Sequence, residues 1–331
     1  MGEIRQDRVT KRWIIYAPDR GDRPYAYRKR TRKCEGVPIY DRSCPFCPGN
    51  ESMLLHVISE HFMDGGMRWQ TRVVPNKYPA LEPCEKKLEG FEGIYLTMGN
   101  YGFHEVIIES PYHNVDIKDM SIEEIELIIE TYRKRYLELI AKDGIKTILI
   151  FRNHGVQAGA SLLHPHSQLI ASSFIPEHFQ NIQRGARSYF DENRSCIFCE
   201  MIRVEGEIKK RVVLDNPCFL CFVPFAAEVP FEVWIVPKRH ISSLKKLCDA
   251  EKTSLARTLK DILMRLHASL NDPDYNLVFY SFDADPADSP CLHFYVQIRP
   301  RLTTYAGFEI GSGTFINPSL PERDCDFLSG R

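Results

Sequence analysis

The chain has 331 residues, of which 44% are hydrophobic and 26% are charged, and its formal net charge is −1. A near-neutral chain of this length is typical of a globular protein, and we expect neither a nucleic-acid partner nor a membrane partner, because it has no basic excess and no run of eighteen apolar residues. The charged start "MGEIRQDR" does not resemble a secretory leader, so we expect a cytoplasmic protein.

The eleven cysteines are unusually many for such a protein. In a reducing compartment, cysteines paired at short spacing more often bind a metal than form disulfides. The first pair along the chain is "CPFC", at Cys44 and Cys47. The next landmark is "HEVIIESPYH" at 104–113, which predicts a strand ending at His113.

A helix and two strands are predicted after this landmark. In "SIEEIELIIETYRKRYLELIAKDG" (121–144), apolar residues recur every three or four positions, Ser121 and Glu124 form a capping box, and Gly144 stops the helix. The apolar run "KTILIF" (146–151) predicts a strand, and a glycine-containing loop leads to "SLLHPHSQLIAS" (161–172). We expect the alternating side chains of His164, His166 and Gln168 on one face of this last strand.

The second half of the chain repeats the same order. It contains "CIFC" at Cys196 and Cys199, "FEVWIVPKRH" at 231–240, a helical pattern at 249–272, "YNLVFY" at 275–280 and "HFYVQ" at 293–297. A gapless alignment of "HEVIIESPYH" with "FEVWIVPKRH" makes His240 the counterpart of His113. We therefore predict an α+β fold of two homologous domains, 1–190 and 191–331, divided near the polar segment "GARSYFDENRS".

Each half offers two thiols and two imidazoles that could surround one metal ion. Zinc accepts sulfur and nitrogen ligands in a tetrahedron, and four protein ligands leave no position for a substrate, so we predict two structural zinc ions per chain. The alternative is a set of ordinary buried thiols with hydrogen-bonded histidines. The third pair, "CFLC" at 218–221, has no matching histidines and is interpreted as part of a buried strand. The predicted sets are Cys44, Cys47, His113 and His164, and Cys196, Cys199, His240 and His293.

His166 would remain free beside a metal-bound His164. A neutral imidazole can act as a nucleophile toward phosphorus, and the Gln168 amide can donate to a phosphate oxygen without acting as an acid or base. The small residues of "FRNHGVQAGAS" would let backbone N–H groups approach a phosphate closely, although an ordinary glycine loop beside a partly buried histidine pair remains the alternative. Because Tyr295 occupies the matching position of the second half, we predict that only the first half is catalytic.

These motifs, "HPHSQ" preceded by "GAS", by a CxxC pair and by "SPYH", resemble those of the galactose-1-phosphate uridylyltransferases, the nucleotidyl-transferring branch of the histidine-triad superfamily. The resemblance extends from "APDRGDRP" to "AGFEIGSGTFINP". It implies two tandem histidine-triad-like half-barrel domains with antiparallel sheets, and a homodimer. It also implies a ping-pong reaction in which His166 takes a nucleoside monophosphate from a nucleotide sugar and passes it to a hexose 1-phosphate. Gln168 stands where hydrolytic relatives have a third histidine, so the resemblance implies an intermediate that survives water.

The resemblance also implies a set of substrate contacts. The arginines of "DRGDRP" are similar to phosphate-contacting residues, the asparagine of "VVPNKYPAL" is similar to a nucleotide contact, and the sugar is expected near "AGFE". The polar residues before and within "HPHSQ" are similar to phosphate ligands. The residues implied in addition to His166 and Gln168 are Arg20, Arg23, Asn76, Asn153, Ser161, Phe308 and Glu309.

Two departures from the best-known members affect the expected substrate and metal. Lys77 follows Asn76 where those members have an aspartate, and their second metal set uses a glutamate and histidines, so iron could replace zinc at the second site of this chain. Both features are more similar to divergent bacterial and archaeal members and to plant ADP-glucose phosphorylases. The first expectation is transfer of UMP between UDP-glucose and galactose 1-phosphate, in galactose metabolism. The alternatives are transfer or phosphorolysis of an adenylyl group from ADP-glucose, or a non-catalytic zinc-stabilised nucleotide-binding protein; Gln168 disfavours a hydrolase.

Overall fold

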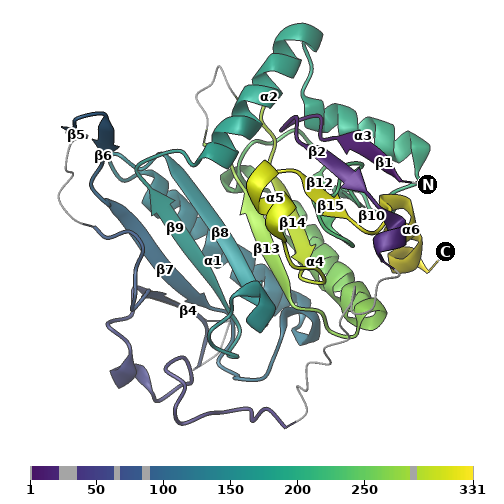
Figure 1. Ribbon diagram of the computed structural model, residues 1–331. Coiled ribbons are helices and arrows are strands. Elements are labelled where there is room, and N and C mark those ends of the chain that lie inside the picture. The colour runs from purple at the N-terminus through teal and green to yellow at the C-terminus, as the bar shows by residue number, and fades with distance from the viewer. Residues whose placement is uncertain (1, 22–35, 63–67, 84–89, 284–288, 331) are drawn as a thin grey trace. The chain divides into compact units, whose positions relative to one another are not determined.

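A computed structural model of the chain describes residues 2–21, 36–62, 68–83, 90–283 and 289–330 (Figure 1). The predicted contact Arg23 lies outside these ranges. The chain forms two compact units. The N-unit comprises Val37–Arg152 and Leu162–Pro176, and the C-unit comprises Met1–Gly36, Asn153–Ser161 and Glu177–Arg331.

The N-unit is built on an antiparallel sheet with the strand order β8-β9-β7-β4-β3. The N-unit also contains a short hairpin of β5 and β6 and the 3-10 helices η2 and η3. Helix α1 contacts β4 and β7 of the sheet. The elements are β3 (Ser59–Phe62), β4 (Trp69–Pro75), β5 (Gly90–Glu92), β6 (Tyr95–Thr97), β7 (Gly102–Ile108), β8 (Thr147–His154), β9 (His166–Ser172), α1 (Ile122–Ile140), η2 (Glu51–Met53) and η3 (Ile117–Asp119).

Helix α1 forms where the apolar period predicts it. The Ser121 hydroxyl accepts a hydrogen bond from the Glu124 backbone N–H at 3.2 Å, and the Glu124 carboxylate accepts one from the Ser121 N–H at 2.7 Å, which completes the predicted capping box. The apolar stripe, with Ile125 and Ile129 fully buried, faces the core. The helix ends at Ile140, a few residues before Gly144.

The C-unit contains antiparallel strands that pair in the order β10-β11-β12-β14-β13. Helix α4 contacts β11, and a small sheet, β1-β2-β15, contains the parallel pair β2 and β15. The strands are β1 (Glu3–Gln6), β2 (Trp13–Tyr16), β10 (Val212–Asp215), β11 (Phe219–Phe222), β12 (Val233–Pro237), β13 (Tyr275–Tyr280), β14 (Tyr295–Pro300) and β15 (Phe315–Asn317). The helices are η1 (Pro18–Arg20), η4 (Val156–Ala158), α2 (Glu177–Asn193), α3 (Ile197–Ile208), η5 (Leu244–Lys246), α4 (Asp249–Leu270), α5 (Gly307–Ser312) and α6 (Pro321–Ser329).

The expected α+β class with antiparallel main sheets is confirmed, and the parallel pairing of β2 with β15 is an addition to it. Most of the polar segment at 185–195 lies in α2, which ends at Asn193. The expectation for His164 was wrong in one respect: β9 begins at His166, and His164 lies in the bend before it. Pro165 separates the two histidines and has no N–H to contribute to a strand ladder. No helix in the described ranges is both long enough and apolar enough to cross a membrane.

Candidate functional site

The first predicted metal set comes together inside the N-unit, and its side chains are buried. Cys47 Sγ lies 3.5 Å from His113 Nδ1 and 3.6 Å from His164 Nδ1, and Cys44 Sγ lies 3.7 Å from His164 Nδ1. A tetrahedral zinc ion with ordinary bond lengths separates its sulfur and nitrogen ligands by about 3.6 Å. The four side chains therefore fit a closed four-ligand metal centre.

Contacts around this set support metal binding. The His164 Nε2–H donates to the Ser110 carbonyl at 2.8 Å, which leaves the Nδ1 lone pair toward the thiols. Burial lowers the pKa of His164 to about 4, so its imidazole is neutral, the form that binds a metal. Burial also raises the pKa of Cys44 to about 11, so its thiolate requires a nearby cation at neutral pH.

The second predicted set comes together in the C-unit with the same arrangement. Cys199 Sγ lies 3.3 Å from His240 Nδ1 and 3.7 Å from His293 Nδ1, and Cys196 Sγ lies 3.9 Å from His293 Nδ1. The Nε2–H groups of His240 and His293 donate to the carbonyls of Ser289 and Pro237, at 3.0 and 2.9 Å. These four residues could also bind a metal ion, whereas the third pair, at 218–221, forms no such cluster within the described part of the chain.

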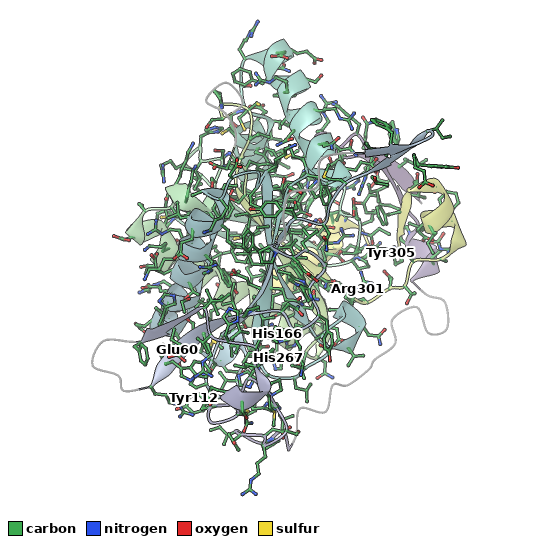
Figure 2. All side chains as sticks on the ribbon, turned by 90° about the vertical axis from the view of Figure 1, so that its left-hand side faces the viewer. Glu60, Tyr112, His166, His267, Arg301 and Tyr305 are labelled. Atoms are coloured by element: carbon green, nitrogen blue, oxygen red, sulfur yellow. The ribbon has the colours of Figure 1, made fainter. Side chains whose placement is uncertain are left out.

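His166, labelled in Figure 2, is the first residue of β9. Its side chain is buried, with 7% of its surface exposed. Its Nδ1 lies 2.8 Å from the His164 carbonyl oxygen, and since a carbonyl can only accept, Nδ1 must carry the proton. The lone pair of the neutral ring is therefore on Nε2. Burial lowers the pKa of His166, which favours this neutral form. The ring of Phe46, from the "CPFC" loop, lies edge-on to His166 with 5.3 Å between centroids.

Gln168 projects from β9 on the same face as His166. Its Oε1 lies 3.3 Å from Asn76 Nδ2 and 2.8 Å from His104 Nε2. Asn76, expected as a nucleotide contact, therefore also contacts the side chain of Gln168. His104 is not among the residues predicted from the sequence. The signal that could have indicated it is its position in the aligned repeat, where the second half has Phe231.

A buried polar network lies on the opposite face of β9, beneath the histidine. The Ser167 and Tyr132 hydroxyls lie 2.6 Å apart, both contact Glu109 Oε1, and Arg152 Nε donates to Glu109 Oε2 at 2.9 Å. The Glu109 backbone N–H donates to the Pro165 carbonyl at 3.1 Å. This network therefore connects α1, β8 and the residue that follows β7 to the segment that holds His166.

We expect Glu109→Gln to lower the free energy of unfolding by about 3 kcal/mol, because the substitution removes one of the carboxylates that pair with the buried Arg152 guanidinium, the other being Asp116. Chemical denaturation measures the change. Glu130→Gln, which alters the partly exposed pair with Arg133 on α1, is the matched control and should change stability by no more than about 0.5 kcal/mol. Equal effects of the two substitutions would contradict a special role for the buried network.

The end of β8 and the loop that precedes "HPHSQ", residues Asn153–Ser161, belong to the C-unit, where residues near β13 hold them. Asp274 accepts a hydrogen bond from the Gln157 N–H at 2.6 Å, and Asn276 Nδ2 donates to Asn153 Oδ1 at 2.9 Å. A Cβ at Gly155, which has φ +86°, would lie 1.9 Å from Asp274 Oδ1, so only glycine fits there. Because the side-chain oxygen of Asn153 accepts the hydrogen bond from Asn276, the NH₂ group of Asn153 is the end of the amide that can donate.

The other predicted substrate residues of the C-unit are also described. Arg20 ends η1, and Ser161 follows the loop. In α5, Phe308 is exposed, and the Glu309 carboxylate accepts a hydrogen bond from the Ala306 N–H at 3.0 Å, which caps the helix. These residues and His166 belong to different units, so their joint action stays a prediction.

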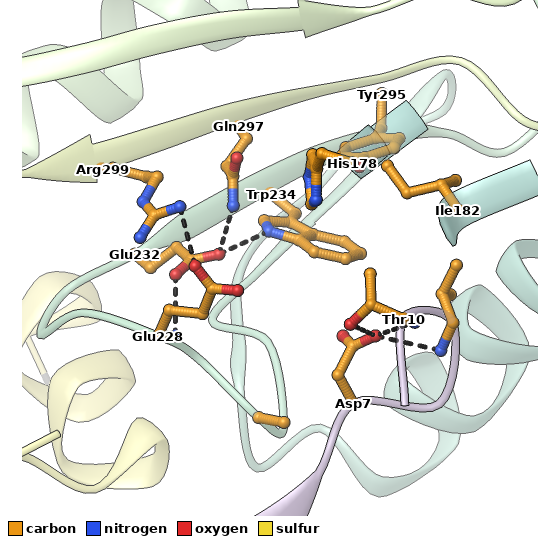
Figure 3. Close-up of a pocket in the computed structure, with 12 residues that line it drawn as sticks. Asp7, Thr10, His178, Ile182, Glu228, Glu232, Trp234, Tyr295, Gln297 and Arg299 are labelled. Carbon is orange, nitrogen blue, oxygen red and sulfur yellow. Dashed lines mark hydrogen bonds and ion pairs between the residues drawn. The ribbon is translucent and has the colours of Figure 1, made fainter. Parts of the chain in front are cut away.

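The second half has no free nucleophile at the position that matches His166 (Figure 3). Tyr295 is stacked between Trp234 and Tyr280, with centroids 4.7 and 4.5 Å away, and burial raises its pKa well above the ordinary value. Gln297 Nε2 donates to Glu232 at 2.6 Å, so its NH₂ group is already engaged. The adjoining cavity of about 20 Å³ has room for about one water molecule. Catalysis by the first half alone stays a prediction.

Comparisons with known proteins cover nearly the whole chain. Residues 2–176 match the family model for the galactose-1-phosphate uridyl transferase N-terminal domain, and residues 182–300 match that for the C-terminal domain. The chain is 36% identical to an Arabidopsis thaliana ADP-glucose phosphorylase, covering 97% of this chain and 90% of that protein. It is 31% identical to a Thermotoga maritima galactose-1-phosphate uridylyltransferase, covering 97% and 96%.

Two solved structures show the same similarity. The crystal structure of the Arabidopsis thaliana ADP-glucose phosphorylase with bound ADP-glucose superimposes with a TM-score of 0.85 at 33% identity, covering 100% of this chain and 99% of that one. A uridylyltransferase structure superimposes with a TM-score of 0.75 at 27% identity, covering 100% and 98%. The similarity in sequence and in fold thus extends over nearly the whole chain.

Proposed function

The chain belongs to the galactose-1-phosphate uridylyltransferase family, and we propose that it moves a nucleoside monophosphate between a nucleotide sugar and a hexose 1-phosphate through a covalent bond to His166. The observation that carries this proposal is the 2.8 Å contact between His166 Nδ1 and the His164 carbonyl oxygen. That contact directs the ring proton to the carbonyl and leaves the Nε2 lone pair available for phosphorus.

In the first half-reaction, Nε2 of His166 attacks the α-phosphorus of the nucleotide sugar. A nitrogen–phosphorus bond forms, the bond from the α-phosphorus to the bridging oxygen breaks, and hexose 1-phosphate leaves with the bonding electrons. The imidazole becomes a cation, and its Nδ1–H hydrogen bond to the His164 carbonyl becomes charge-assisted. This bond therefore stabilises the intermediate more than the free enzyme, as catalysis requires.

In the second half-reaction, a phosphate oxygen of the acceptor attacks the same phosphorus, and the nitrogen–phosphorus bond breaks. Gln168 donates from its amide to the phosphoryl oxygens but cannot remove a proton from water, so the intermediate persists until an acceptor arrives. Additional donors in this proposal come from Arg20, Arg23, Asn76, Asn153 and Ser161, with the sugar near Phe308 and Glu309.

The two cysteine–histidine clusters are proposed to hold one zinc ion each, with iron as the alternative at the second site. A closed four-ligand zinc ion supplies no reaction chemistry; it joins distant segments of the chain. The first ion would connect the "CPFC" loop to the segment that presents His166. About two metal ions per chain are therefore expected in protein purified without chelator.

UDP-glucose is the first proposed donor, because the family model and several curated relatives are named for uridylyl transfer. ADP-glucose is the second candidate, favoured by the 36% identity to the plant phosphorylase. With UDP-glucose as the donor, the acceptor is galactose 1-phosphate. With ADP-glucose as the donor, the reaction is adenylyl transfer or phosphorolysis. We propose that the enzyme is located in the cytoplasm, where thiols remain reduced and can bind metal. We also propose that it is a homodimer, which light scattering can test.

The test is the intact mass of the protein after incubation with UDP-glucose or ADP-glucose and no acceptor. An increase equal to UMP supports the first donor, and an increase equal to AMP supports the second. Subsequent addition of a hexose 1-phosphate should remove the adduct and yield a new nucleotide sugar. The absence of an adduct with either donor would overturn the proposed function and leave the binding-protein alternative.

A further inference from the structure

The side-chain oxygen of Gln168 accepts from two donors, which settles the orientation of its amide. His104 Nε2 lies 2.8 Å from Gln168 Oε1, and Asn76 Nδ2 lies 3.3 Å from the same oxygen. An amide oxygen has two lone pairs, so these donors occupy both. No hydrogen bond within the described part of the chain uses Gln168 Nε2, which is left as the donating end.

Backbone groups in turn fix both donors. The Ala80 N–H donates to His104 Nδ1 at 3.1 Å, so the proton of the neutral His104 ring must be on Nε2, which faces Gln168. Burial lowers the pKa of His104 and favours this neutral form. The Tyr78 N–H donates to Asn76 Oδ1 at 2.9 Å, so the Asn76 NH₂ group also faces Gln168. The short segment 76–80 thus determines the direction of the entire chain of hydrogen bonds.

We propose that His104 is a positioning residue that holds the Gln168 amide with its NH₂ group toward the reacting phosphoryl group. This inference rests on the proposed function, because it assigns His104 a role in the nucleotidyl transfer at His166. His104 itself contacts neither the nucleophile nor the reacting phosphorus in this scheme; it acts only through Gln168.

The physical reason is the near-symmetry of an amide. Rotating the Gln168 amide by 180° exchanges its oxygen and nitrogen at almost no steric cost, and the oxygen would then repel the phosphoryl oxygens. With the longer 3.3 Å contact to Asn76 alone, less would oppose this rotation. The repeat agrees with this reasoning: the non-catalytic half has Phe231 at the position aligned with His104, and its Gln297 donates to Glu232.

The test uses His104→Phe, which keeps a ring but removes the donor, and His104→Gln, whose amide can still donate. In single-turnover measurements of adduct formation, we expect His104→Phe to be slower by about 10- to 100-fold, with the dissociation constant of the nucleotide sugar little changed. His104→Gln should recover most of that loss. A purely structural role would instead alter the thermal unfolding temperature and would not be rescued by a second donor.

A double-mutant cycle with Gln168→Ala completes the test. If His104 acts through Gln168, His104→Phe should cause no further slowing in the Gln168→Ala background. Equal slowing in both backgrounds, or a His104→Phe variant as fast as the natural chain, would overturn this inference. Because the natural chain is measured in parallel, failure of the proposed function appears separately, as the absence of any adduct in it.

Discussion

We expect a chain carrying His166→Gly to form no nucleotidyl adduct with UDP-glucose or ADP-glucose, and we expect its transfer rate to fall by about 10⁴- to 10⁶-fold, the range seen when a covalent nucleophile is removed. The loss is this large because no other described side chain takes the same position on β9. Gln168 is an amide without nucleophilic character, and Ser167 lies on the opposite face in the network with Glu109. Intact-mass analysis and a coupled assay for released hexose 1-phosphate measure the two effects.

The matched control is Tyr295→Phe, at the repeat position that corresponds to His166. It keeps the aromatic stack with Trp234 and Tyr280 and should retain both the adduct and the transfer rate. Peptide mapping of the natural adduct should place it on the segment that contains His166. An adduct that persists in His166→Gly would show that the nucleophile is wrongly assigned, even if the overall reaction is as proposed.

The long periodic segments are predictable because one apolar face determines both their length and their orientation. The helix expected at 249–272 is observed as α4, Asp249–Leu270, and it is capped by Asn271 in the left-handed region, φ +57°. The strand at 275–280 occupies the expected residues. The two cysteine–histidine clusters are equally predictable from sequence, because two cysteines and two histidines recur in the same order in both halves.

Contacts that depend on strand register are not predictable in this way. The β7–β9 ladder pairs Val106 with Gln168, which brings His104, two residues before Val106, within hydrogen-bond distance of Gln168. Nothing in the local sequence indicates that register. The bond from Asn276 to Asn153 joins residues separated by 123 positions, so no periodicity could indicate it. Sequence therefore locates the reactive groups, whereas the residues that orient them emerge only from the fold.

The largest expected loss of stability comes from Cys47→Ser in the first metal set. Cys47 is fully buried, lies within hydrogen-bond distance of both histidines of the set and accepts the Asp41 backbone N–H at 3.3 Å. We expect this variant to bind one metal ion fewer per chain. It should lose about 4 kcal/mol of unfolding free energy where free metal exceeds the dissociation constant about a thousandfold. Elemental analysis and chemical denaturation measure the two changes.

Two other cysteines provide the controls for this prediction. Cys218→Ser, in the third CxxC pair, should leave the metal content unchanged, and Cys199→Ser should remove one metal ion from the C-unit. Only Cys47→Ser should also slow adduct formation strongly, because the "CPFC" loop carries Phe46, whose ring lies 5.3 Å from that of His166. If Cys47→Ser retains both metal ions, or if Cys218→Ser loses one, the ligand assignment is wrong. If metal is lost without any effect on the His166 adduct, the first cluster stabilises the fold but does not position the nucleophile.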